Sequence, residues 1–190
     1  SVKKVELVVR MAKSAVMKVE AGLACTFGCP FEGRPPMEQL DRVVSRYVEL
    51  GITDVGLSDT IGVANPVQMY EVCVHMLDKF PQLNWSLHLH NTRDLALANV
   101  VTALQAGITR FEAAIGGLGG CPYAPGATGN VATEDLVNML HEMGVETGVD
   151  LDALIGVATM VQGVIPHRLA SAMLRAGRGN CLLSAPREQQ

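Results

Sequence analysis

Two histidines one residue apart, His88 and His90, are the sharpest chemical feature of the sequence. They end the segment 84–90 (NWSLHLH), whose residue types predict a strand. Because side chains alternate across a strand, both imidazoles face the same side of it. Two rings so placed can share a divalent ion, whereas the alternative is a pair of histidines bonded to backbone or carboxylate groups. The position at the carboxyl end of a strand favours the metal.

A third ligand has to come from a distant part of the chain, and the glycine-rich segment 116–130 is the natural source. It ends in Asn130, whose amide oxygen suits a hard cation, although a Gly-Asn pair more often marks a turn or the entry to a helix. It also holds Cys121, between Gly120 and Pro122. An accessible thiol there could transfer a proton or attack a carbon, whereas most cysteines are small buried apolar residues. The context favours chemistry, in a loop that closes over a ligand.

Three other polar features each allow a structural and a functional interpretation. Asp59 ends an otherwise apolar strand, where it could cap the turn toward Gly62, orient a histidine or accept a substrate hydroxyl. Glu134 lies in the first turn of a predicted helix, where acids favour the helix dipole, and it could also support the site from behind. Cys25 and Cys29 have the spacing of half a zinc site, but no partner pair follows, which favours a loop role.

Strand and helix patterns alternate along the chain and must position these residues. The expected strands are 19–26, 52–58, 84–90 and 108–116, and the expected helices are 5–19, 37–48, 66–80, 95–107, 133–143, 150–163 and 166–177. This alternation predicts an α/β fold with a parallel sheet, either open and doubly wound or part of a (β/α)₈ barrel. A barrel needs about 250 residues, so four strands amount to half of one. Polar residues follow every expected strand, at the edge where parallel α/β folds carry function.

The composition narrows the class of protein. The 190 residues are 48% hydrophobic and 18% charged, with a net charge of −4 and no basic block, so nothing indicates a nucleic-acid partner. No apolar stretch reaches the roughly 18 residues of a membrane span, and the first residues do not resemble a secretory signal. Five scattered cysteines favour reduced thiols in a cytosol-like compartment.

Taken together, these segments resemble the 3-hydroxy-3-methylglutaryl-CoA lyase family, within the DRE-type metal-dependent TIM-barrel lyases. The resemblance rests on four segments: ACTFGCPFEG (24–33), LSDTIG (57–62), HLHNT (88–92) and GGLGGCPYAPGATGNVATEDL (116–136). The Gly-Cys-Pro loop is specific to the lyases, whereas the other motifs are shared with isopropylmalate and homocitrate synthases. The resemblance reaches to about residue 155. It implies that residues 1–190 form a single partial TIM-barrel domain, with barrel strands five to eight and extra helices from about residue 150.

The resemblance also implies roles for individual residues. His88, His90 and Asn130 resemble the metal ligands, for Mg²⁺ or Mn²⁺, and His88 is implicated in proton transfer as well. Cys121 resembles the catalytic cysteine of the loop. Two further residues resemble acids that support turnover: Asp59 and Glu134.

The family reaction splits 3-hydroxy-3-methylglutaryl-CoA into acetyl-CoA and acetoacetate, a retro-Claisen cleavage used in leucine degradation and ketone-body metabolism. It needs a cation to polarise oxygens, a base for the hydroxyl proton and an acid for the enolate carbon. The expected partners are an acyl-CoA substrate and further copies of the chain, without nucleic acid or membrane. The expected location is the cytoplasm, or the mitochondrial matrix in a eukaryote. Two alternatives stay open: a related aldolase or Claisen enzyme on another 3-hydroxyacyl-CoA or oxo acid, and an inactive fragment.

The sequence lacks one segment of the family pattern. The family begins with an Arg-Asp pair at the end of its first strand, which supplies a metal carboxylate and a guanidinium, and this sequence has no such segment. The chain therefore resembles the C-terminal half of the barrel, beginning inside the fourth helix. We expect poor metal affinity, and self-association through the unpaired sheet edges.

Overall fold

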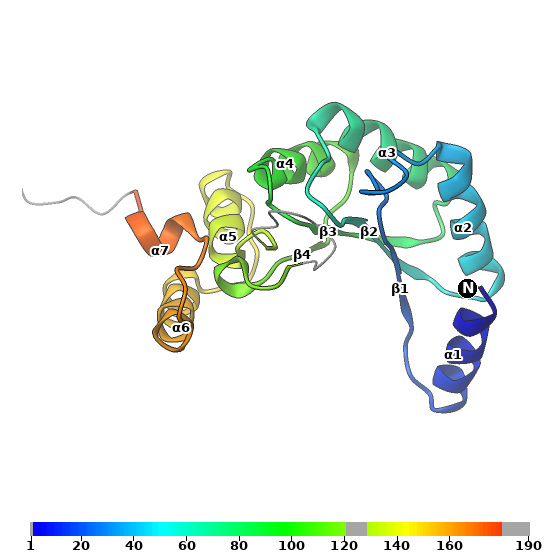
Figure 1. Cartoon of the computed structure of the whole chain (residues 1–190), viewed down its shortest axis with the longest axis horizontal. Coiled ribbons are helices and arrows are strands. Elements are labelled where there is room, and N and C mark those ends of the chain that lie inside the picture. The colour runs from blue at the N-terminus through cyan, green and yellow to red at the C-terminus, as the bar shows by residue number, and fades with distance from the viewer. Residues whose placement is uncertain (1, 121–128, 180–190) are drawn as a thin grey trace, which may run out of the picture.

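The computed structural model describes residues 2–120 and 129–179, and within them a four-stranded, fully parallel sheet. The strands lie in chain order: β1 (Glu20–Leu23), β2 (Asp54–Asp59), β3 (Asn84–Leu89) and β4 (Phe111–Glu112). A helix follows each of the first three strands before the next one begins, as Figure 1 shows. The predicted alternation of strand and helix is confirmed.

The helices comprise one before the sheet, three between its strands and a C-terminal group. They are α1 (Val2–Ser14), α2 (Met37–Glu49), α3 (Pro66–Lys79), α4 (Ala96–Ala106), the short 3₁₀ helix η1 (Ile115–Gly117), α5 (Thr133–Glu142), α6 (Leu151–Val164) and α7 (Ala172–Ala176). α3 begins at the predicted proline, and the Asn65 side chain caps it by accepting a hydrogen bond from the Gln68 N–H. Within the described residues, no helix combines the length and apolarity that a bilayer crossing requires.

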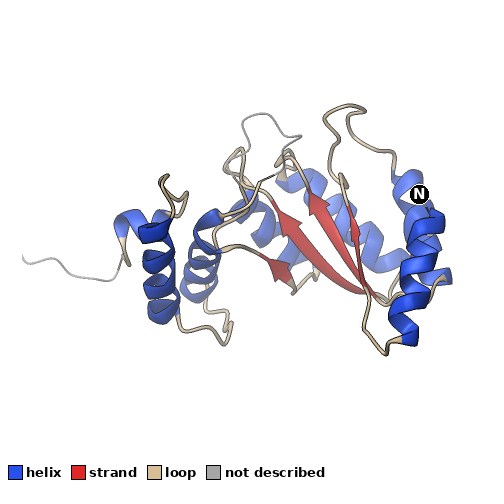
Figure 2. Ribbon diagram, turned by 60° about the horizontal axis from the view of Figure 1, so that its bottom comes forward, coloured by secondary structure: helices blue, strands red, loops and turns tan. Residues whose placement is uncertain are grey.

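The two faces of the sheet differ in chemistry. Along β3, Trp85, Leu87 and Leu89 are buried on the face covered by helices, whereas Ser86 and His88 alternate with them toward the other face. Figures 1 and 2 show α2, α3 and α4 on one side of the sheet, and no described helix covers the opposite side. The core therefore lies between sheet and helices, and the residues of chemical interest lie on the uncovered face or at the carboxyl ends of the strands.

The expected fourth strand, 108–116, is much shorter in the structure. Only Phe111 and Glu112 pair with β3, although the Arg110 carbonyl also accepts the Leu87 N–H. The chain then turns through η1, where Gly116 has a positive φ of 63° that ends the extended conformation. The apolar pattern of the segment did not reveal this turn.

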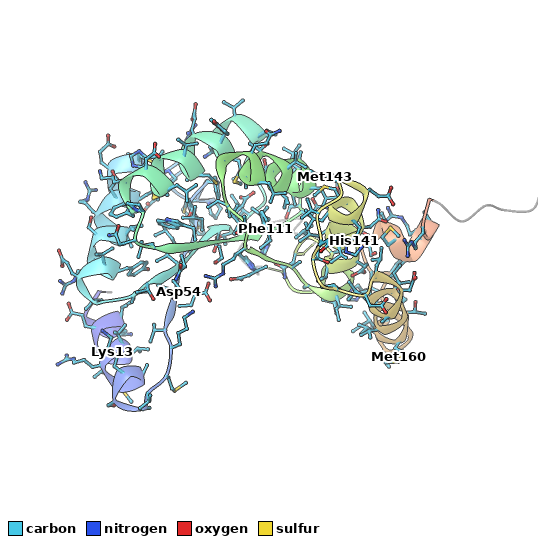
Figure 3. All side chains as sticks on the ribbon, turned by 180° about the vertical axis from the view of Figure 1, so that it is seen from behind. Lys13, Asp54, Phe111, His141, Met143 and Met160 are labelled. Carbon is cyan, nitrogen blue, oxygen red and sulfur yellow. The ribbon has the colours of Figure 1, made fainter. Side chains whose placement is uncertain are left out.

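Two expected helices are also shorter than predicted. The segment 166–177 contains only the five residues of α7, because the Gln162 side chain bonds the backbone of His167 and Leu169 in a non-helical turn first. α1 ends at Ser14 rather than near residue 19, since Val16 is left-handed (φ 55°) where the chain reverses into β1. Figure 3 labels Asp54, the first residue of β2, beside the segment that leads from this reversal into β1.

Candidate metal centre

The His88 and His90 rings lie together at the carboxyl end of β3. Their centroids are 5.3 Å apart, in an edge-to-face arrangement. His90 is only 7% exposed, and burial, followed by the neighbouring His88, lowers its pKa below the ordinary value. The pair is thus placed as the alternation predicts, and the lowered pKa of His90 favours the neutral form that binds metals.

Asn130 is brought beside His90, forty residues away in the chain. The two residues form an isolated antiparallel bridge, and on either side of it Asn91 N–H bonds the Gly129 carbonyl and Val131 N–H bonds the Leu89 carbonyl, both at 3.0 Å. The Asn130 amide nitrogen donates to the Leu118 carbonyl at 2.7 Å, which fixes the orientation of its side chain. The predicted third ligand therefore lies next to His90.

Two buried polar atoms at this bridge have no hydrogen-bond partner in the described part of the chain: His90 Nδ1 and Asn130 Oδ1. Leaving a buried acceptor unsatisfied typically costs about 1–3 kcal/mol, so such atoms call for an explanation. An imidazole nitrogen and an amide oxygen are both metal ligands, and a bound divalent ion would satisfy both. The residues present therefore fit a cation. Residues 2–120 and 129–179 contain no group of three His, Cys, Asp or Glu side chains arranged to hold a metal ion, and the predicted set instead uses the Asn130 amide as its third ligand.

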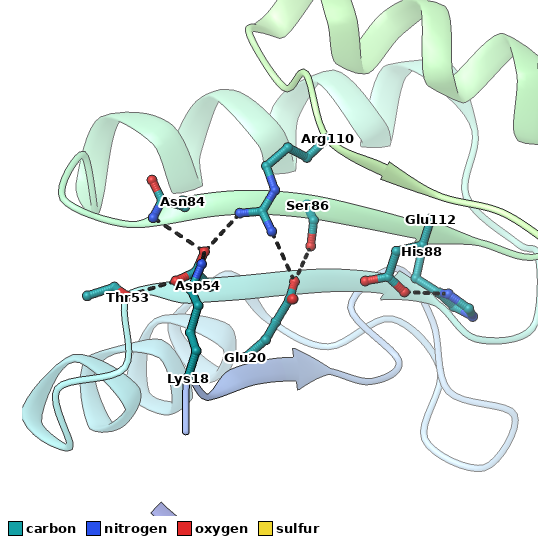
Figure 4. Close-up of polar contacts among 9 residues, drawn as sticks. All are labelled: Lys18, Glu20, Thr53, Asp54, Asn84, Ser86, His88, Arg110 and Glu112. Atoms are coloured by element: carbon teal, nitrogen blue, oxygen red, sulfur yellow. Dashed lines mark hydrogen bonds and ion pairs between the residues drawn. The ribbon is translucent and has the colours of Figure 1, made fainter. Parts of the chain in front are cut away.

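Glu112 is a site residue that the sequence interpretation missed. Its Oε2 lies 3.0 Å from Nδ1 of His88, its direct neighbour across β3 and β4 (Figure 4). A signal was present in the sequence, because Glu112 is an acidic residue within the expected strand 108–116. The expected strand 108–116 places Glu112 in the middle of a strand, whereas in the structure it is the last residue of β4.

Asp59 is buried and bonded to the turn that follows it. Its two oxygens accept the N–H groups of Val63 and Ala64 at 2.9 and 3.0 Å. Burial raises the pKa of Asp59, while these backbone bonds and Arg93 partly offset the rise. The turn packs on the end of β3, since a Cβ on Gly62 would lie 3.0 Å from the His90 carbonyl oxygen. Its contacts therefore match the capping interpretation, and through the turn it supports His90.

Glu134 is fully buried and holds the start of the glycine-rich segment. Both of its oxygens lie near the Gly116 N–H, at 3.0 and 3.1 Å. This N–H begins the turn that leads toward Leu118, the residue that orients Asn130. Glu134 thus contacts the backbone of the glycine-rich segment, and its support of the site stays a prediction.

The cysteine predictions have different outcomes. Cys121, the candidate catalytic thiol, lies outside the described residues. Cys29 belongs to a turn closed by two backbone bonds with Gly33, at 2.8 and 2.9 Å, which agrees with a loop role for the Cys25–Cys29 segment.

A hollow of about 530 Å³ lies next to Asn130. Its walls are residues 116–120, Gly129 and the segment 167–170. Gly119 lies in this wall and against Asn130, because a Cβ on it would be 2.9 Å from the amide nitrogen. None of the three proposed ligands lines this hollow, which adjoins Asn130 through its neighbours Gly119 and Gly129.

Comparison with known proteins assigns the family. The family model described as HMGL-like matches residues 1–161. A hydroxymethylglutaryl-CoA lyase of Bacillus subtilis is 46% identical over 164 residues, covering 86% of this chain and 55% of that protein. An (R)-citramalyl-CoA lyase of Chloroflexus aurantiacus is 41% identical over 155 residues, covering 82% of this chain and 49% of that protein.

A solved structure agrees with this assignment. An HMG-CoA lyase from Acinetobacter baumannii, in complex with coenzyme A and 3-methylmalate, superposes with a TM-score of 0.89 at 43% identity, covering 95% of this chain and 59% of that one. The chain spans about half the length of the curated relatives it matches. Its four βα units are of the TIM-barrel type and form part of such a barrel. The chain belongs to the HMGL-like family.

Proposed function

We propose that the protein is a metal-dependent carbon–carbon lyase that cleaves 3-hydroxy-3-methylglutaryl-CoA to acetyl-CoA and acetoacetate. The observation that carries the proposal is the pairing of His90 with Asn130, with one unsatisfied ligand atom on each. The lyases at 41–46% identity support the reaction class. Residues 1–190 act in this proposal as part of one barrel domain whose remaining strands complete the site.

The proposed ligands are His88, His90 and Asn130, and the proposed ion is Mg²⁺ or Mn²⁺. When bound, such an ion polarises the hydroxyl and carboxyl oxygens of the substrate and lowers their proton affinity. Two imidazoles and one amide carry no negative charge. We therefore expect weak affinity in this chain, because a carboxylate from outside it is missing from the ligand set.

The cleavage needs one proton removed and one delivered. In the proposed reaction His88 takes the proton from the substrate hydroxyl, and that carbon becomes the ketone of acetoacetate. The electrons of the broken carbon–carbon bond pass to the thioester enolate, and Cys121 delivers a proton to its carbon to give acetyl-CoA. Asp59 and Glu134 support turnover by holding the turn beside His90 and the backbone of Gly116.

A second candidate is the same chemistry on (R)-citramalyl-CoA. The 41% identical relative that carries this name favours it. Both substrates are acyl-CoA thioesters, so the metal ligands alone do not separate them. Homo-oligomerisation, and a cytoplasmic or mitochondrial-matrix location, stay predictions.

The metal centre is tested by titrating the protein with Mn²⁺ alone and following the free ion by electron paramagnetic resonance. We expect His90→Ala to weaken binding at least about tenfold, because it removes a direct ligand. His75→Ala is the matched control, since His75 bonds Asp41 between helices α2 and α3. Equal affinities for the wild type and His90→Ala would refute the ligand assignment.

The reaction is tested by assaying cleavage of the two thioesters by the protein. Acetoacetate released from 3-hydroxy-3-methylglutaryl-CoA, with slower cleavage of (R)-citramalyl-CoA, supports the first candidate, and the opposite preference supports the second. Cleavage of neither substrate with saturating Mg²⁺ or Mn²⁺ would leave the inactive-fragment alternative.

A further inference from the structure

A carboxylate on the uncovered face of the sheet lies against one of the proposed metal ligands. Glu112 is in β4 and His88 is in β3, and their Cα atoms are partners in the parallel ladder. Directly opposed residues of neighbouring strands point to the same face. The register of two short strands therefore brings the two side chains together, with Glu112 Oε2 3.0 Å from His88 Nδ1 (Figure 4).

This contact determines which nitrogen of His88 carries the proton. An ionised carboxylate only accepts hydrogen bonds, so Nδ1 must be the donor. In the neutral ring Nε2 then has the free lone pair. On the opposite side of His88 the ladder partner is Ser58, and no hydrogen bond joins its side chain to the ring among the described residues. Glu112 is thus the group that fixes this ring.

We propose that Glu112 is a positioning residue that holds His88 with Nε2 presented to the divalent ion. The inference rests on the proposed function, because it deepens the same site. Metal-bound histidines typically donate their second ring N–H to such a partner, which fixes the tautomer and raises the basicity of the ligand nitrogen. Glu112 touches neither ion nor substrate in this role and acts only through His88.

The sheet offers a matched control on the same face. Glu20, in β1, is also part-exposed and also bonded, to Ser86 at 2.9 Å and to Arg110 at 3.7 Å, but it does not contact either histidine. Removing Glu20 therefore changes the charge of this face by the same amount as removing Glu112. Only the second change frees the His88 ring.

The first test reads the tautomer in the metal-free protein by ¹⁵N NMR of labelled histidines, with His88 assigned from a His88→Gln variant. Wild type and Glu20→Ala should show a protonated Nδ1 and an unprotonated Nε2. Glu112→Ala should shift the proton toward Nε2, which is the preferred site in free histidine. An unchanged His88 spectrum in Glu112→Ala would overturn the proposal, whether or not the chain binds a metal.

The second test measures Mn²⁺ affinity with no substrate present. Loss of such a partner typically weakens metal binding about 10–100-fold, and we expect a loss in this range for Glu112→Ala. Glu112→Gln keeps an acceptor for Nδ1–H and should lose less. Equal losses in Glu112→Ala and Glu20→Ala, or in Glu112→Ala and Glu112→Gln, would overturn the positioning role. If His90→Ala binds as the wild type does, the metal site itself fails, which separates the two proposals.

Discussion

The buried acids around this site bond backbone N–H groups rather than cations. Asp59 accepts from Val63 and Ala64, and Glu134 accepts from Gly116. A buried carboxylate without partners would be costly, so each of these contacts stabilises one conformation of the loop it holds. The two carboxylates therefore determine where the loops lie, and the loops determine where the proposed ligands lie.

Replacing Glu134 with Gln should destabilise the protein although the two side chains have the same shape. The amide can accept the Gly116 N–H with one atom only, and its NH₂ group adds a buried donor where the carboxylate had an acceptor. A buried unsatisfied group costs about 1–3 kcal/mol, and we expect a loss of that size in urea unfolding. Glu142→Gln, an exposed change on the same helix, is the control. Equal stability of the two variants would contradict this role.

The predictability of the site differs from residue to residue for physical reasons. His88 and His90 follow from strand periodicity, which is local information. Asn130 lies beside them because of backbone bonds to Leu89 and Asn91, which are long-range and not encoded in any spacing. The sequence interpretation reached Asn130 through residue type and resemblance, and it missed Glu112, whose contact depends on the register of β4.

At the level of elements, the segment 116–120 and the residues 129–132 pack on one another at the end of the sheet. Asn130 N–H bonds the Gly119 carbonyl at 3.1 Å, and Gly129 occupies a position where a Cβ would be 2.1 Å from the Gly117 carbonyl oxygen. Gly129 also has φ 111°. Such a close approach of two backbones leaves no room for a side chain, so glycine here is a requirement of the site geometry.

Gly129→Ala should therefore displace Asn130 and abolish Mn²⁺ binding. Its control is Gly144→Ala, which also has a positive φ (75°) but no neighbour within 4 Å of the added Cβ. Gly144→Ala should lower the free energy of unfolding by only about 1–2 kcal/mol, the cost of a left-handed alanine, and should keep the metal affinity. Unfolding curves and Mn²⁺ titrations of both variants measure the difference, and full metal binding by Gly129→Ala would contradict the packing argument.

The elements themselves were predicted better than their ends. Helix α3 begins at the predicted proline because Asn65 and Pro66 are local signals. β4 was predicted far too long, since the turn at Gly116 depends on the Glu134 carboxylate 18 residues away. Local chemistry therefore predicts the start of an element, whereas a tertiary contact determines where this strand ends.

At the scale of the molecule, the uncovered face of the sheet is polar from end to end. The histidines and Glu112 occupy the carboxyl end, and Asp54 lies at the opposite end of β2, where Lys18 and Arg110 bond it at 2.9 and 3.0 Å (Figure 4). Thr53 and Asn84 donate to the same carboxylate. In parallel barrels the amino-terminal end of the strands serves stability and the carboxyl end serves function. Asp54 should therefore affect folding but not metal binding.

The Asp54 network predicts how stability depends on pH. Hydrogen bonds from Lys18 first, and also from Thr53 and Arg110, lower the pKa of Asp54 from 3.8 to about 2 despite its burial. Because the folded pKa is below the unfolded one, the ionised group stabilises the fold above pH 4, and this stabilisation is lost as the pH falls toward 2. Allowing for the exposure of Lys18 and Arg110, the contribution at neutral pH is about 1–2 kcal/mol.

Urea unfolding of wild type and Asp54→Asn between pH 7 and pH 3 measures this contribution. The variant should be less stable by that amount at pH 7, and the gap should shrink by about half at pH 3, because the unfolded wild-type chain takes up a proton there that the folded chain does not. Asp78→Asn, an exposed acid on α3, should show no such gap at either pH. A gap for Asp54→Asn that stays constant over the whole range would show that the side chain contributes by packing rather than by charge. Unchanged Mn²⁺ affinity in the same variant would show that the amino-terminal end of the sheet contributes to stability and not to the proposed ion binding at the carboxyl end.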